Sequence, residues 1–245
     1  MDATSQEKPG YFARIRANRA LLFIVLLLAL FVPLAIMARS PGLLHLDAEV
    51  TQEIQEGHSN PLDFLAYFFT FLGNAMTMTV LCIGSAVVLA RSGRPRAAWF
   101  SLLTLLGLPL NVLLKLMINR PRPTADLVRI LFPEPGDSSF PSGHAMGSVI
   151  VYGFLAYLTW TFLTDQPRRR FWTVVLALTP VGISLSRIYI GVHWFSDVIG
   201  AWMFGLVVLL IFAELYKVMG IKERRNPDET DTVGGEKPVG ISPQP

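Results

Sequence analysis

Three titratable side chains lie close together in an otherwise apolar part of the chain. Arg187, His193 and Asp197 all fall within residues 186–197. If this region is helical at its end, His193 and Asp197 are four residues apart and share a face. A carboxylate beside an imidazole holds the ring in one tautomer and makes it a better base or nucleophile. Because such groups are costly to bury, they indicate either chemistry or a buried ion pair that packs two helices.

Two cations occur earlier in the chain, within the run Lys-Leu-Met-Ile-Asn-Arg-Pro-Arg-Pro at 115–123. Lys115 and Arg122 are seven residues apart, two helical turns, although Pro121 and Pro123 disfavour regular helix from about Arg120 onward. Two cations at a helix end suit a phosphate group. The alternative is that both side chains extend to lipid headgroups.

A third group is the run Pro-Ser-Gly-His at 141–144. Ser142 is a good N-cap residue, and Gly143 allows a ligand to approach the backbone closely. The N–H groups of a helix N-terminus attract an anion, and His144 is placed in the first turn beside it. Taken alone, the run is also compatible with an ordinary helix start. Together, the three groups provide cations for a phosphoryl group, one His to attack phosphorus and another to protonate the leaving oxygen.

The elements that must position these residues are long apolar segments. The chain has 245 residues, of which 52% are hydrophobic and 16% charged, whereas a soluble domain carries about 25% charged residues. Crossing a bilayer takes about 20 apolar residues as helix. We therefore predict an all-α, polytopic membrane protein with six transmembrane helices, at 20–38, 64–90, 97–114, 142–164, 171–186 and 198–213.

Other classes of segment and partner fit the sequence less well. A cleaved signal peptide is the alternative for 20–38, but this apolar core is longer than usual and no clear Ala-x-Ala site follows it. The single Cys82 excludes an intrachain disulfide and a Cys-based metal site, and the four His residues show no zinc spacing. The net charge of +3 reflects basic residues at helix ends, so we expect no nucleic-acid partner.

The distribution of Lys and Arg predicts the topology. Segments 1–19, 91–96, 168–170 and 217–245 hold 15 of the 21 basic residues, so by the positive-inside rule both termini are cytoplasmic. Segments 39–61, 115–141 and 187–196 then face outward, and the three groups of candidate residues share that face. Segment 39–61 also predicts an amphipathic helix, which either lies on the membrane surface or packs as an ordinary loop helix.

The three groups together resemble the signature motifs of the type 2 phosphatidic acid phosphatase (PAP2) family. The matching patterns are Lys-x6-Arg-Pro from Lys115, Pro-Ser-Gly-His at 141–144, and Ser-Arg-x5-His-x3-Asp from Ser186, complete and in the right order. The resemblance covers roughly residues 15–220, preceded by a flexible N-terminus at 1–14 and followed by a disordered cytoplasmic tail at 221–245. It implies a metal-independent lipid phosphatase without a cofactor, in the cell (inner) membrane, with its site facing the periplasm or exterior.

The same resemblance implies a role for each site residue. His193 is the nucleophile and forms a phosphohistidine, Asp197 orients it, and His144 protonates the leaving group and then helps to activate water. The phosphate oxygens are held by five residues, namely Lys115, Arg122, Ser142, Gly143 and Arg187.

Several functions stay open from the sequence. The substrate class includes undecaprenyl pyrophosphate, phosphatidic acid and phosphatidylglycerol phosphate, and segments 39–61 and 132–140 are candidates for selecting among them. A phosphotransferase would use the same residues with an acceptor other than water. An anion transporter would need polar helix interiors, which the spans lack, and a soluble haloperoxidase is disfavoured by the six spans. We expect the bilayer and a lipid phosphate as partners, and no obligate protein partner.

Overall fold

The structure is a computed structural model that describes residues 11–132 and 138–223. In these residues the secondary structure is helical, without a strand. The helices are α1 (Tyr11–Met37), α2 (Pro41–Glu56), α3 (Asn60–Leu72), α4 (Ala75–Arg91), α5 (Pro95–Leu103), the 3-10 turn η1 (Thr104–Leu106), α6 (Gly107–Ile118), α7 (Gly143–Phe162), α8 (Gln166–Tyr189) and α9 (Phe195–Glu223). The all-α prediction is confirmed.

Among the described residues, five helical segments are long and apolar enough to cross a membrane, or six if a bent pair of helices counts as one span. The predicted span 64–90 corresponds to this pair, α3 and α4. Their axes are bent by 53° at a short break between the two helices. Gly73 ends α3, and the side chain of Asn74 accepts a hydrogen bond from the Met76 N–H to begin α4. This capping satisfies backbone groups that a break would otherwise leave unpaired.

The remaining spans follow the prediction with shifted ends. The third is continuous from Pro95 to Ile118, through η1. α8 begins at Gln166, because the Asp165 carboxylate caps it through the Arg168 N–H, so residues expected in a basic loop form its first turns. α9 begins at Phe195 rather than Val198 and ends at Glu223, inside the expected tail.

Both predicted terminal segments are only partly described. α1 begins at Tyr11, so residues 11–14 of the predicted N-terminal segment are helical. Residues 1–10, 133–137 and 224–245 lie outside the described part of the chain, and the rest of the predicted N-terminus and tail falls there.

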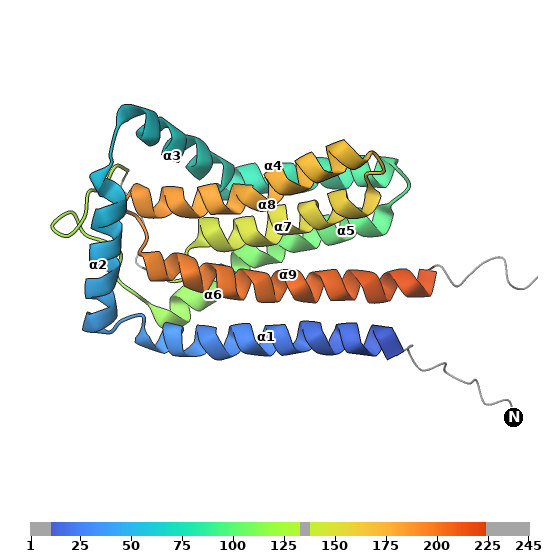
Figure 1. The fold of residues 1–245 in the computed structure, drawn as a ribbon, viewed down its shortest axis with the longest axis horizontal. Coiled ribbons are helices and arrows are strands. Elements are labelled where there is room, and N and C mark those ends of the chain that lie inside the picture. The colour runs from blue at the N-terminus through green and yellow to red at the C-terminus, as the bar shows by residue number, and fades with distance from the viewer. Residues whose placement is uncertain (1–10, 133–137, 224–245) are drawn as a thin grey trace, which may run out of the picture.

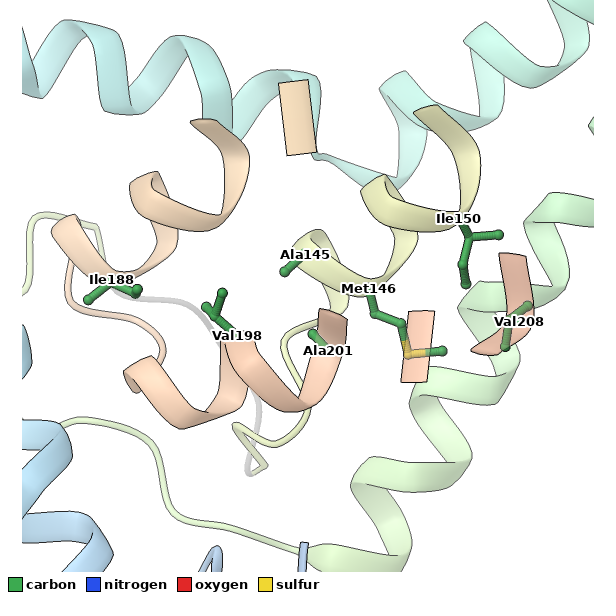
Figure 2. Packing of buried hydrophobic residues seen from close by; sticks show 7 residues of the cluster. All are labelled: Ala145, Met146, Ile150, Ile188, Val198, Ala201 and Val208. Carbon is green, nitrogen blue, oxygen red and sulfur yellow. The ribbon is translucent and has the colours of Figure 1, made fainter. Parts of the chain in front are cut away.

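The helices run side by side along the long axis, with α2 lying across one end (Figure 1). We call this the site end. The opposite end, where α1 begins and α9 finishes, is the terminal end (Figure 1). α7 is the central helix. Of its membrane-spanning stretch 61% is buried inside the protein, against 11% for α1. Apolar residues join α7 to α8 and α9, as Figure 2 shows for Ala145, Met146, Ile150, Ile188, Val198, Ala201 and Val208.

The predicted helix in segment 39–61 is α2, and its buried face is mainly polar. Asp47, Thr51 and Gln55 are buried at intervals of four residues, whereas Leu46 is 58% exposed. The Gln55 amide donates to the carbonyls of Arg129 and Tyr189, at 2.8 and 2.9 Å. Polar contacts therefore help to attach α2 to the rest of the protein, together with apolar packing of Leu44, Ala48 and Ile54.

Candidate active site

The three sequence groups meet at the site end, joined by backbone contacts. The Ser142 N–H donates to the carbonyl of Asp197 at 3.2 Å, which joins the start of α7 to the start of α9. The Arg122 guanidinium donates to the carbonyl of Val192 at 3.0 Å. The Val192 N–H in turn donates to the carbonyl of Arg187 at 3.3 Å. Segments far apart in the sequence thus form one structural unit.

His193 and Asp197 contact each other, as predicted, but not on one face of a helix. His193 precedes α9, which begins at Phe195, and its Nδ1 lies 3.3 Å from Asp197 Oδ2. The same Oδ2 accepts the Trp194 N–H at 2.9 Å. A side chain at the third helical position that reaches back to the preceding N–H is the geometry of a capping box. The two side chains are 1% and 0% exposed.

The other oxygen of Asp197 contacts a residue that the sequence prediction left out of the site. Arg120, 0% exposed, donates from Nη1 to Asp197 Oδ1 and from Nη2 to Asp47 Oδ2, both at 2.5 Å. In the sequence, Arg120 is a basic residue of the outward-facing segment 115–141, and Asp47 lies in the predicted amphipathic helix of segment 39–61. Their separation of 73 residues leaves no local pattern that connects them.

Ser142 stands at the N-cap of α7 as predicted, but its side chain does not cap the helix. Its Oγ is buried and has no hydrogen-bond partner in the described part of the protein. A buried hydroxyl without a partner is costly unless a ligand satisfies it. A Cβ on the neighbouring Gly143 would lie 2.9 Å from Asn111 Oδ1, so a larger residue there would displace the Asn111 amide.

His144 lies in the first turn of α7, half-buried, beside the break between α3 and α4. A Cβ on Gly73 would lie 3.2 Å from His144 Cδ2 and 2.5 Å from Ile183 Cγ2. The break therefore brings bare backbone against the His144 ring.

The three predicted cations occupy different surroundings. Lys115 is half-buried in the last turn of α6. Asn119 then takes a left-handed conformation, with φ 47°, and ends that helix, so Arg122 belongs to the following loop. Arg187 is fully buried in the last turn of α8 and donates to Thr70 Oγ1 of α3 at 3.3 Å. The three cations are thus held at the site end by three different segments, namely α6, the loop after it, and α8.

Residues 96–219, half of the chain, match the family described as the PAP2 superfamily. This protein belongs to the PAP2 superfamily. The matched region contains α6, α7, α8 and most of α9, and with them all of the predicted site residues.

Two relatives of this PAP2 protein have names that describe phosphatases. Phosphatidylglycerophosphatase B of Bacillus subtilis is 34% identical over 122 residues, and undecaprenyl-diphosphatase of Sulfolobus acidocaldarius is 34% identical over 95 residues. These segments are 47% and 38% of the present chain, and 58% and 41% of the relatives. The chain therefore matches about half the length of these relatives.

Two crystal structures share the fold. The transmembrane PAP2 type phosphatidylglycerolphosphate phosphatase from Bacillus subtilis aligns with a TM-score of 0.66 and 24% identity, covering 84% of this chain and 98% of that one. Aquifex aeolicus LpxE aligns with a TM-score of 0.55 and 26% identity, covering 68% and 93%. The PAP2 protein is an integral membrane protein with several apolar helices, and its fold is that of a transmembrane PAP2 protein.

The site contains carboxylates and imidazoles, which are also the usual ligands of metals. Across residues 11–132 and 138–223, however, His, Cys, Asp and Glu side chains form no group of three that could hold a metal ion. The nearby carboxylates of Asp47 and Asp197 instead contact the Arg120 guanidinium. Whether the reaction needs a metal stays a prediction from the sequence, with a direct test given below.

Proposed function

We propose that this PAP2 protein hydrolyses a phosphate ester or pyrophosphate of a membrane lipid, without a metal, through a phosphohistidine on His193. The observation that supports this most strongly is the contact between His193 Nδ1 and Asp197 Oδ2 at 3.3 Å. A carboxylate at Nδ1 favours the tautomer that carries its proton there. Nε2 then keeps its lone pair and is the nitrogen that attacks.

In the first step, Nε2 of His193 attacks phosphorus, an N–P bond forms and the bond from phosphorus to the leaving oxygen breaks. His144 donates its proton to that oxygen, so the alcohol or lipid phosphate leaves in its protonated form. Lys115, Arg122 and Arg187 stabilise the charge on the phosphoryl oxygens. The Ser142 hydroxyl, buried and without a partner in the described residues, is a further donor for these oxygens.

In the second step, the neutral His144 accepts a proton from water as the water oxygen attacks phosphorus. The N–P bond breaks, inorganic phosphate is released and Nε2 regains its lone pair. Asp197 contacts Nδ1 in both steps and stabilises the imidazolium character that develops on His193.

We further propose that the site faces the exterior or periplasm and that both chain ends are cytoplasmic. In the structure α1 begins and α9 ends at one end of the bundle, and α2 lies across the other (Figure 1). The positive-inside distribution supports placing the basic terminal end in the cytoplasm. For a bacterial cell this corresponds to the inner membrane.

The substrate class rests on the named relatives. A phosphatidylglycerophosphatase and an undecaprenyl-diphosphatase are both similar to this chain, so glycerophospholipid and isoprenoid phosphates are the candidates, phosphatidic acid included. From the sequence, segments 39–61 and 132–140 are the candidates for selecting among them, and the role of the first is taken up below. Residues 133–137 of the second segment lie outside the described residues.

The test is phosphate release in detergent from a panel of phosphatidylglycerol phosphate, phosphatidic acid and undecaprenyl pyrophosphate, with and without EDTA. We expect release that EDTA does not change and that His193→Ala abolishes. Activity that disappears with EDTA would contradict the metal-independent reaction. Transfer of the phosphoryl group to an added alcohol, without release of free phosphate, would contradict hydrolysis and favour the phosphotransferase.

A further inference from the structure

A chain of buried charges connects the surface helix α2 to the proposed nucleophile. Arg120 lies between the carboxylates of Asp47 and Asp197, and the exposed fractions of the three side chains are 0%, 2% and 0%. Asp197 in turn contacts His193. A single residue, Arg120, therefore connects Asp47 of α2 to Asp197, the carboxylate that contacts the His193 imidazole.

Both oxygens of Asp197 are held in place. Oδ2 accepts the Trp194 N–H and faces His193 Nδ1, while Oδ1 accepts from Arg120 Nη1 and, at 3.3 Å, from the Ser139 hydroxyl. Because the two oxygens belong to one rigid group, the contacts at Oδ1 fix the direction of Oδ2. The position of the imidazole consequently depends on where the Arg120 guanidinium lies.

Asp47 determines where that guanidinium lies and also fixes the start of α9. Its Oδ1 accepts the Ser196 N–H at 2.8 Å, and its Oδ2 accepts the Ser196 hydroxyl at 2.6 Å as well as Arg120 Nη2 at 2.5 Å. The Ser196 hydroxyl oxygen also accepts from Arg120 Nη1 at 2.7 Å. A carboxylate at a helix N-terminus is favourable, and here it comes from a helix 149 residues away in sequence.

Stability alone explains this arrangement poorly. Replacing a buried ion pair by apolar side chains of similar volume is often neutral or stabilising, because the charges lose their hydration. A buried guanidinium that bridges two carboxylates instead provides a fixed geometry, because its donors have a rigid planar arrangement. Reaction rates depend strongly on geometry, since a displacement of about 1 Å can cost about 10²-fold.

We propose that Asp47 and Arg120 are positioning residues for His193, and that α2 serves the chemical step rather than the choice of lipid. This inference rests on the proposed function, because it needs His193 as the nucleophile. It gives α2 a different role from that of a substrate-selecting helix. The two roles predict different kinetics, since a selecting helix changes KM unequally among lipids whereas a positioning helix changes kcat equally for all of them.

The experiment measures kcat and KM of Asp47→Asn on the lipid panel described above. We expect kcat to fall by about 10²-fold on each lipid while KM stays within about threefold. Glu53→Gln is the matched control, a carboxylate on the exposed face of the same helix, and should behave as wild type. Unchanged kcat in Asp47→Asn, or a fall confined to one lipid, would overturn the inference.

A second variant covers the case in which Asp47→Asn does not fold. Ser196→Ala removes the hydroxyl that bridges Asp47 and Arg120 without leaving a buried charge unpaired. We expect a smaller fall in kcat, of about 3- to 10-fold, with KM and Tm close to wild type. A Ser196→Ala enzyme with wild-type kcat would overturn the inference.

His193→Ala, measured in the same assay, separates the two proposals. If this variant keeps its activity, the proposed nucleophile is wrong and the inference fails with it. If it is inactive while Asp47→Asn is folded and fully active, only the positioning role fails. Loss of activity in His193→Ala together with the uniform kcat effect in Asp47→Asn supports both.

Discussion

The site end and the terminal end differ in how their charged side chains are buried and paired. At the site end, Asp47 and Asp197 are buried and both contact the buried Arg120 directly. At the terminal end, Arg94 and Arg96 remain exposed or half-buried and lie over aromatic rings, 4.2 Å from the Phe162 centroid and 5.2 Å from the Tyr216 centroid.

The charges at the site end hold other side chains in position, whereas those at the terminal end lie against aromatic rings and hold their own segment in place. A cation over a ring keeps its hydration and gains about 0.5–1 kcal/mol at an exposed site. A buried ion pair loses hydration and is stabilising only with good geometry and further hydrogen bonds. Substitutions at the site end should therefore affect catalysis strongly, whereas those at the terminal end should have only small effects on stability. The following predictions test this distinction.

The largest effect among them is expected for Asp197→Asn. The amide cannot hold His193 in the tautomer with its Nδ1 proton toward residue 197, so Nε2 loses its role as nucleophile. By analogy with the aspartate of serine proteases, kcat should fall by about 10⁴-fold. Glu214→Gln on the same helix, which removes a carboxylate paired with Lys217 at 2.6 Å, should leave phosphate release unchanged. Equal losses in both variants would contradict the distinction.

A smaller loss is expected for Lys115→Met, which keeps the length of the side chain and removes its charge. If Lys115 stabilises the phosphoryl oxygens, kcat/KM should fall by about 10²-fold, corresponding to about 3 kcal/mol. Lys217→Met is the control at the other end of the bundle, where activity should stay at the wild-type level. Wild-type activity in Lys115→Met would remove that residue from the site.

Gly191→Ala should reduce stability at the site end. Gly191 has φ 78°, and a Cβ there would clash with the carbonyl oxygen of Arg129. We expect the free energy of unfolding to fall by about 1–3 kcal/mol. Gly93→Ala offers a matched comparison, with φ 72° and nothing within 4 Å of the new Cβ, so its loss of stability should be smaller. Thermal unfolding in detergent measures both, and equal shifts in Tm would show that the clash has no effect.

Arg96→Gln should have the smallest effect. The substitution removes the contact with the Tyr216 ring and the hydrogen bond to the Met219 carbonyl at 3.0 Å. We expect a loss of about 1 kcal/mol of stability and unchanged phosphate release. A large loss of activity would show that this end of the molecule also takes part in catalysis.

The fold was largely predictable because each span is an apolar run of membrane-spanning length. The break at Gly73 and Asn74 was missed because these two residues are uncharged and lie inside such a run. The starts of α8 and α9 were misplaced because caps formed by Asp165 and Asp197 extend helices into polar sequence. Hydropathy identifies spans, but caps determine where the helices begin.

The contact between His193 and Asp197 was predictable from the sequence, but the contacts that hold Asp197 in place were not. His193 and Asp197 are four residues apart, and local spacing was enough to pair them. Arg120 and Asp47 each had an ordinary local explanation, as a basic loop residue and as part of a polar helix face. Their pairing depends on tertiary contacts across 73 and 77 residues of sequence. Such contacts appear only when the helices are assembled.

The most direct test of the central claim is to trap the covalent intermediate. Wild-type protein is mixed with a lipid carrying ³²P in its terminal phosphate, quenched in alkali within one turnover and digested. We expect a label that is stable to base and labile to acid, on the peptide that contains His193, and no label in His193→Ala. Label on another residue, or wild-type turnover by His193→Ala, would contradict the account.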